Sequence, residues 1–231
     1  MKLAGLQKLT LLDFPGHVAC TVFTAGCNLR CPFCHNSELV LPERKPPLMG
    51  EEEFFSFLSK RKGILEGVCV TGGEPLLQKD IADFLRRTKE LGFAVKLDTN
   101  GCFPGKLREL VEQGLVDFVA MDIKNSPARY GETVGIPAFD LTAVEESVDY
   151  LMSGAVDYEF RTTVAAQFHD EQSFHDIGRW IAGAKRYALQ EFRDSGDVLA
   201  GGLAPCTPEQ MQAFLSILKP LVPDAFLRGT E

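Results

Sequence analysis

Short apolar runs rich in β-branched residues alternate with helical repeats along most of the chain. Between the runs, apolar side chains recur every three or four positions, as in Phe54, Phe57 and Leu58. This spacing is typical of helices with one buried face. A helix between two strands makes a crossover connection, which favours parallel pairing of those strands. The runs predict six strands, over Val18–Thr24, Gly67–Thr71, Phe93–Asp98, Val116–Asp122, Val156–Val164 and Tyr187–Phe192.

Two later helices carry start signals. Thr142 with Glu145 fits a capping box, and Thr207 with Gln210 fits another. Six strand–helix units are too few for the eight-stranded barrel, so we expect an α/β fold built as a partial (βα)6 barrel of parallel strands. No Ser- or Gly-rich linker interrupts the chain. We therefore predict one domain over residues 1–231, with a core over about 16–193 and a C-terminal helix over 207–219.

Polar and glycine-rich motifs follow the predicted strands where each one ends. In barrels and open α/β sheets, the carboxyl ends of the strands form the active site. Six separate segments therefore indicate one functional edge. In chain order they are CNLRCPFC, GGEP (Gly72 to Pro75), DTNG (Asp98 to Gly101), MDIK (Met121 to Lys124), Arg161, and the region of Gln190 and Arg193.

Three of the seven cysteines, Cys27, Cys31 and Cys34, have the spacing C-x3-C-x2-C. Three thiolates on a short loop can hold a cubane cluster and leave its fourth iron without a protein ligand, whereas ordinary electron carriers use four cysteines per cluster. The alternative is a structural zinc ion with His35 as the fourth ligand. Because His35 adjoins Cys34, convergence of both on one ion is awkward.

Composition narrows the classes of partner. The net charge of −8 and the pI of about 5.1 argue against non-specific binding to nucleic acid. No apolar run approaches the roughly 20 residues that span a bilayer, and the N-terminus does not read as a signal peptide. We expect a cytoplasmic protein without nucleic-acid or membrane partners. Thiols stay reduced there, and clustered cysteines more often indicate metal than disulfides.

The cysteine spacing, the aromatic Phe33 before the last cysteine, and GGEP together resemble the radical S-adenosylmethionine superfamily. CHN (Cys34 to Asn36), DTNG and MDIK resemble, more narrowly, the activases of glycyl radical enzymes. The segments LLDFPG, GCNLRCPFCHN, VDFVAMDIK, YEFRTTV and LQEFR are most similar to the activating proteins of anaerobic ribonucleoside-triphosphate reductases, in their longer form. This resemblance runs from about Leu11 to Arg193.

The resemblance implies one 4Fe–4S cluster on Cys27, Cys31 and Cys34, and S-adenosylmethionine chelated to the open iron. Reductive cleavage would give a 5′-deoxyadenosyl radical, which removes hydrogen from a glycine of the partner. Glu74 would accept hydrogen bonds from the ammonium group of S-adenosylmethionine, although GGEP also fits a plain tight turn. The implied contacts with S-adenosylmethionine are Phe33, Gly72, Gly73, Glu74, Asp98, Asn100, Asp122, Lys124 and Arg161.

Two carboxylates end neighbouring strands and would repel each other unless a cation separates them. The resemblance implies a monovalent cation there, and plain helix N-caps are the alternative. Lys124 and Arg161 would bind the ligand carboxylate, or Arg161 would neutralise Asp122 or Glu159. The cation would be held by Asp98, Thr99, Met121 and Asp122.

The implied partners are a glycyl radical enzyme and an electron donor such as flavodoxin or ferredoxin. Two other classes stay open: a radical enzyme acting on a small molecule, similar to 7-carboxy-7-deazaguanine synthase, and an electron-transfer protein. The missing fourth cysteine and the GGEP motif speak against the electron-transfer protein. CHN, DTNG and MDIK favour the activase over the small-molecule enzyme.

Overall fold

The structure, a computed structural model, describes residues 1–41, 46–194 and 196–229. Its strands form a single curved sheet in the order β1 to β8. All neighbours pair in parallel except β1, which runs antiparallel to β2. The predicted partial barrel of parallel strands is confirmed. The strands are β1 (Leu3–Thr10), β2 (Ala19–Thr24), β3 (Gly67–Gly72), β4 (Ala94–Thr99), β5 (Phe118–Asp122), β6 (Asp157–Val164), β7 (Tyr187–Glu191) and β8 (Ala225–Arg228).

Strands β2 to β7 are the six that the sequence pattern predicts, and β1 and β8 are two further strands at the edges of the sheet. In β1, a mixture of exposed and buried residues obscures the alternation that marks a half-buried strand. β8 has only four residues. Both edges therefore lack the signal on which the prediction depends.

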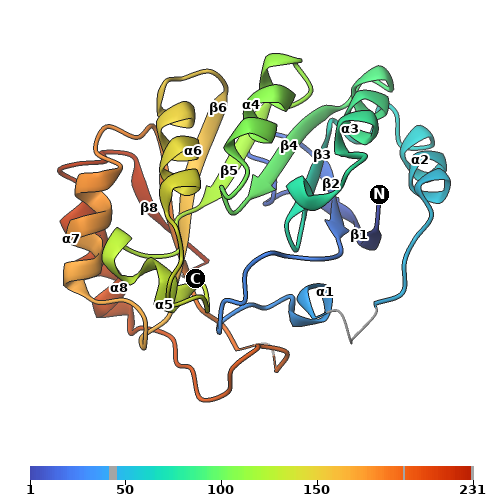
Figure 1. Ribbon diagram of the computed structural model, residues 1–231. Coiled ribbons are helices and arrows are strands. Elements are labelled where there is room, and N and C mark those ends of the chain that lie inside the picture. Colours follow the sequence, from blue (N-terminus) through green and yellow to red (C-terminus); the bar gives the residue numbers. More distant parts are fainter. Residues whose placement is uncertain (42–45, 195, 230–231) are drawn as a thin grey trace.

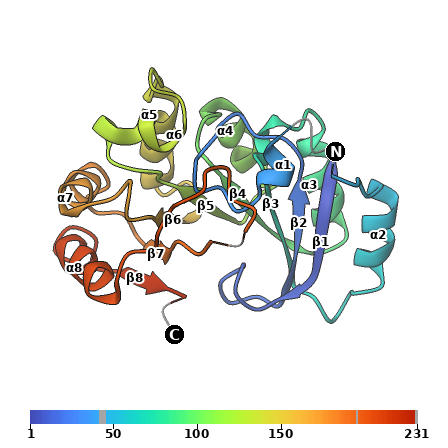
Figure 2. The ribbon, with the colours of Figure 1, turned by 90° about the horizontal axis from the view of Figure 1, so that it is seen from below.

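The longer helices pack on the outer face of the sheet, as Figures 1 and 2 show. Viewed from below, they follow an arc that stays open between β1 and β8 (Figure 2). No helix in the described part of the chain is long and apolar enough to cross a membrane. The outer helices are α2 (Glu51–Ser59), α3 (Ile81–Glu90), α4 (Pro104–Glu112), α6 (Thr142–Met152), α7 (Glu171–Trp180) and α8 (Pro208–Leu218), and two single turns are α1 (Ser37–Val40) and α5 (Tyr130–Thr133).

One of the two predicted capping boxes is confirmed and the other is wrong. The Thr207 side chain accepts a hydrogen bond from the Gln210 N–H, and the Gln210 side chain accepts one from the Thr207 N–H. At α6 the N-cap residue is Leu141, without a side-chain cap. The carboxylate of Asp140 accepts from the Thr142 N–H at 3.0 Å instead. Asp140, which lies just before the first turn of α6, therefore accepts the hydrogen bond from the start of this helix.

The apolar core lies between the sheet and the outer helices, and the inner face of the sheet is polar. Successive side chains of a strand point to opposite faces. On β5, Met121 is fully buried in the apolar core, while Asp122 lines the inner cavity. On β4, Lys96 and Asp98 form an ion pair with each other. The inner face therefore presents the polar and charged side chains, and the outer face presents the apolar side chains that pack against the helices.

A buried ion pair ties the last strand to the sheet. Glu159 on β6 is 0% exposed and accepts two hydrogen bonds of 2.8 Å from the guanidinium of Arg228 on β8. Bidentate pairs of this kind are stronger than single hydrogen bonds. The pair spans β7, which lies between the two strands.

We expect Arg228→Met to lower the free energy of unfolding by about 3 kcal/mol, because it leaves a buried carboxylate without its cation. Urea unfolding of the metal-free protein measures the change. The matched control is Arg186→Met, which removes a pair of 3.4 Å with the exposed Asp224 and should cost less than about 1 kcal/mol. Equal effects of the two changes would contradict the role of the buried pair.

Candidate active site

A cavity of about 240 Å³ lies at the carboxyl ends of the central strands, under the loop that follows β2. It gathers residues from β3, β4, β5, β6 and β7, as expected for the functional edge of such a sheet. Most of the predicted site residues line it. They are Cys27, Cys31, Phe33, Cys34, Gly72, Gly73, Asp98, Thr99, Asn100, Asp122, Lys124 and Arg161.

The cysteine loop is fastened by backbone contacts from distant parts of the chain. The Gly26 N–H donates to the Leu39 carbonyl at 2.7 Å, and the Arg30 N–H donates to the Val134 carbonyl at 3.0 Å. The Ala200 N–H donates to the Pro32 carbonyl at 2.9 Å. These contacts fix the course of the loop without using its side chains.

The two glycines of GGEP are required by this loop. A Cβ on Gly72 would lie 2.2 Å from the Thr24 nitrogen, and one on Gly73 would lie 2.0 Å from the Gly26 oxygen. The Gly73 N–H donates to the Thr24 carbonyl at 2.9 Å. The resemblance implies that Gly72 and Gly73 contact S-adenosylmethionine. In the structure the close approach is to the backbone that begins the cysteine loop.

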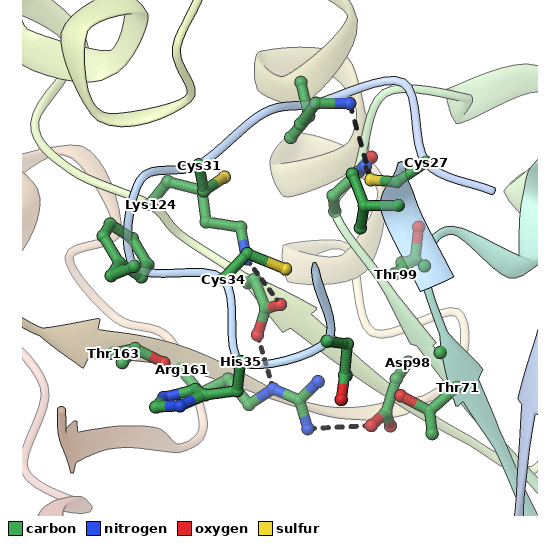
Figure 3. A pocket seen from close by; sticks show the side chains of 18 of the residues that line it. Cys27, Cys31, Cys34, His35, Thr71, Asp98, Thr99, Lys124, Arg161 and Thr163 are labelled. Carbon is green, nitrogen blue, oxygen red and sulfur yellow. Dashed lines mark hydrogen bonds and ion pairs between the residues drawn. The ribbon is translucent and has the colours of Figure 1, made fainter. Parts of the chain in front are cut away.

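The three thiols of the loop surround a common space, as Figure 3 shows. Burial raises the pKa of the Cys31 thiol to about 12, with Lys124 opposing the shift. Burial likewise raises the pKa of Cys27 and Cys34. A metal that binds such thiols displaces their protons. The site is therefore a set of largely buried thiols beside one ammonium group, which would offset the negative charge of the thiolates that hold a cluster.

The zinc alternative depends on His35 as a fourth ligand. His35 stacks on Phe192 with the ring centres 5.4 Å apart. Across the described residues, no three His, Cys, Asp or Glu side chains converge as one metal ion would require. The donor set of three cysteines on one loop fits a cubane cluster whose fourth iron has no protein ligand.

Glu74 lies behind the cavity and does not line it. Its carboxylate is 0% exposed and accepts hydrogen bonds from the Leu76 N–H at 3.0 Å, the Thr99 hydroxyl at 2.9 Å and the Asn100 N–H at 2.7 Å. Burial raises its pKa to about 7, against the effect of these donors. The expected contact of this carboxylate with a ligand ammonium stays a prediction, and in the structure three protein groups donate to it. Glu74 joins the GGEP turn to the end of β4.

Arg161 lies between the two strand-end carboxylates. Its guanidinium contacts Asp98 at 2.9 Å (Figure 3). It also pairs with Asp122. Lys124 pairs with Asp122 at 2.8 Å, and Lys96 pairs with Asp98. Burial alone would raise the pKa of Asp122, but Arg161 and Lys124 outweigh it and hold that pKa well below its usual range. Cations and carboxylates therefore alternate across β4, β5 and β6.

The expected monovalent cation site looks different in the structure. The separation of Asp98 and Asp122 is provided by the guanidinium of Arg161. Met121 does not line the cavity, because it alternates with Asp122 and packs near Gly101 on the other face. Thr99 lines the cavity, but its hydroxyl donates to Glu74.

Asn100 connects the end of β4 to the cysteine loop. Its side-chain amide donates to the Asn28 Oδ1 at 2.8 Å and lies 3.9 Å from the Cys27 sulfur. The Leu29 N–H donates to the same sulfur at 3.4 Å. Donors to a ligating sulfur tune the reduction potential of an iron–sulfur cluster. This places Asn100 beside a ligand of the expected cluster.

Seven residues that line the cavity were not predicted as ligand contacts: Leu29, His35, Asn36, Val40, Thr71, Thr163 and Gln190. The signal was available for Thr163, because it lies two positions after Arg161 and so shares its face of β6. Gln190 was recognised only as a strand end. Arg193 turns away and donates to the Gly229 carbonyl.

The Arg161 bridge makes a prediction about acid stability. The pKa values of Asp98 and Asp122 are lowered in the folded protein, so their contribution is complete above about pH 4 and is lost as the pH falls further. We expect Arg161→Met to lower the free energy of unfolding at pH 7 by about 3–5 kcal/mol, because it leaves two buried carboxylates adjacent.

Urea unfolding of the metal-free protein between pH 3 and pH 7 measures both effects. In the variant, the loss of stability below pH 4 should shrink, since the carboxylates no longer have lowered pKa values. Arg179→Met, at an exposed pair with Asp176, is the control and should keep the acid dependence of the parent. A parallel pH profile for Arg161→Met would contradict the bridge.

Comparison with known proteins agrees with this site. The chain is 33% identical over 193 residues to an assigned glycyl-radical enzyme activating enzyme of Methanocaldococcus jannaschii, covering 82% of this chain and 79% of the relative. It is 32% identical over 131 residues to the pyruvate formate-lyase-activating enzyme of Clostridium pasteurianum, covering 54% and 52%. It is 39% identical over 97 residues to the 7-carboxy-7-deazaguanine synthase of Hyperthermus butylicus, covering 42% and 40%.

The fold agrees as well. A domain of a pyruvate-formate lyase-activating enzyme from Bacteroides vulgatus superposes with a TM-score of 0.58 and 18% identity, covering 71% of this chain and 99% of that domain. The family model of the radical SAM superfamily matches residues 21–177, which include the cysteine loop, GGEP, DTNG, MDIK and Arg161. With its three-cysteine loop above the open end of a partial barrel, the chain belongs to the radical SAM superfamily.

Proposed function

We propose that this protein activates a glycyl radical enzyme, and that its partner is an anaerobic ribonucleoside-triphosphate reductase. The observation that carries the proposal is the three-thiol loop above a cavity lined by DTNG and MDIK residues. The relative from Methanocaldococcus jannaschii supports the activase class over most of both chains. The segments LLDFPG, YEFRTTV and LQEFR support the narrower choice of partner.

The chain's own residues fit the cofactors of this reaction. Cys27, Cys31 and Cys34 would hold a 4Fe–4S cluster, which would supply the one electron needed to cleave S-adenosylmethionine into methionine and a 5′-deoxyadenosyl radical. Lys124 and Arg161 line the cavity and would hold the carboxylate of S-adenosylmethionine. The electron would come from a small donor of the flavodoxin or ferredoxin class, in a cytoplasmic setting.

The inner ion network also takes part in the proposal. Arg161 separates Asp98 and Asp122, so the chain's own guanidinium would serve where a monovalent cation was expected. Glu74 would act through the backbone it holds, because its carboxylate is already bonded to three donors. The ammonium group of S-adenosylmethionine would then meet the backbone of Gly72 and Gly73, which line the cavity.

An open sheet suits a macromolecular substrate. The edges β1 and β8 are not neighbours in the sheet order, and the arc of strands stays open between them (Figure 2). A glycine carried on a loop of a large enzyme could enter on this side. A second function, modification of a small molecule in the manner of a 7-carboxy-7-deazaguanine synthase, is favoured only by a match over 40% of that enzyme's length.

The cluster assignment is tested by metal content. We expect the anaerobically reconstituted protein to bind about four irons and four sulfides per chain, and Cys27→Ala, Cys31→Ala or Cys34→Ala to abolish the cluster. Cys20→Ala is the matched control, because Cys20 is 0% exposed in the core and its change should leave the iron content intact. A parent protein that holds one zinc and takes up no iron would overturn the assignment.

The activase function is tested by following one hydrogen. With deuterium on the α-carbon of the partner's glycine, we expect the label to appear in 5′-deoxyadenosine, because the radical takes its hydrogen from that carbon. Electron paramagnetic resonance of the mixture should show a glycyl radical on the reductase. Label transfer from a small metabolite, with none from any glycyl radical enzyme, would favour the second function.

A further inference from the structure

One acceptor in the cavity lacks a partner. The Oε1 atom of Gln190 on β7 is buried and has no hydrogen-bond partner among the described residues. The residue lines the cavity at its β7 side. Buried polar atoms without partners are rare in folded proteins and need an explanation. A ligand that donates a hydrogen bond would provide one.

Three other polar side chains of the wall have protein partners. Arg161 is held by two carboxylates, Lys124 by Asp122, and the Asn100 amide by Asn28. Gln190 pairs in the sheet with Thr163 of β6. Its unsatisfied oxygen therefore distinguishes it from the charged residues near the cluster loop.

The position of Gln190 links it to the open side of the sheet. β7 is separated from this side only by the edge strand β8, whereas the cysteine loop follows β2 near the opposite edge. A second cavity of about 240 Å³ lies against β1 and is lined by Ala4, Gly5 and Phe23. His35 and Asn36 line both cavities. The residues that follow Cys34 therefore border both cavities.

We propose that Gln190 binds the peptide backbone of the substrate, with its Oε1 accepting a hydrogen bond from an amide N–H next to the target glycine. A side-chain amide carries both an acceptor and donors, so it is complementary to a peptide group, which presents one of each. The glycine loop would run from the cavity at β1, past His35, to Gln190. This inference rests on the proposed activase function and deepens it by naming the recognised chemical group.

The test measures binding of two ligands to the same reconstituted protein under anaerobic conditions. The probe is a blocked nonapeptide that spans the glycine site of the candidate anaerobic ribonucleotide reductase, and S-adenosylmethionine is the second ligand. We expect Gln190→Leu to weaken peptide binding roughly 10-fold, since a hydrogen bond in a desolvated site is lost. The Kd for S-adenosylmethionine, the iron content and the thermal unfolding midpoint should stay within about twofold or a few degrees of the parent.

Gln172→Leu is the matched control, because that glutamine lies exposed on α7 and bonds only to Asp176 in the described structure. It should change neither Kd. Peptides methylated at single backbone nitrogens complete the design. Methylation of the recognised nitrogen should weaken binding to the parent roughly 10-fold and have little further effect in Gln190→Leu.

Several results would contradict the proposed role of Gln190. Weaker binding of S-adenosylmethionine with unchanged peptide binding would assign Gln190 to the cofactor and overturn the inference. Unchanged binding of both ligands would overturn it too, and so would equal sensitivity of parent and variant to methylation at every nitrogen. If the parent binds no glycine peptide while cleaving S-adenosylmethionine, the proposed function fails first, and that result is distinct from a failure of Gln190 alone.

Discussion

The contact of Arg161 with Asp98 and Asp122 is the constraint on which the inner face of the barrel depends. A partial barrel brings strand ends together, and here it brings two carboxylates onto adjacent strands. Without a cation between them the carboxylates would repel, and burial would add to that cost. Arg161 on β6 supplies the cation from the next strand, so β4, β5 and β6 hold each other in register at the level of the cavity.

This network also sets the charge that a ligand meets. Each carboxylate is shared between two cations: Asp98 between Lys96 and Arg161, and Asp122 between Arg161 and Lys124. The series begins and ends on a lysine, so it keeps an excess of positive charge. This excess positive charge favours binding of a ligand carboxylate beside Lys124, close to the thiols. The same side chains serve ligand binding and folding stability. A substitution in this network will therefore affect both quantities together.

Much of the site could be predicted because its residues follow strands with clear apolar patterns. The cysteine loop, DTNG, MDIK and Arg161 all converge on one cavity, since the carboxyl ends of parallel strands share one edge. The role of Glu74 could not be predicted, because its partners Thr99 and Asn100 come from another strand end. The same holds for the edge strands, whose pairing depends on the finished sheet.

The fastening of the cysteine loop has a consequence for the maturation of the protein. The loop between Gly26 and Cys34 is held by Leu39, Val134 and Ala200, which are spread over most of the chain. A nascent chain still on the ribosome exposes the cysteines long before those partners exist. The geometry that receives iron is therefore complete only after the C-terminal third has been made and packed. The loop reaches the course described here only once Ala200 has been made and has packed against Pro32.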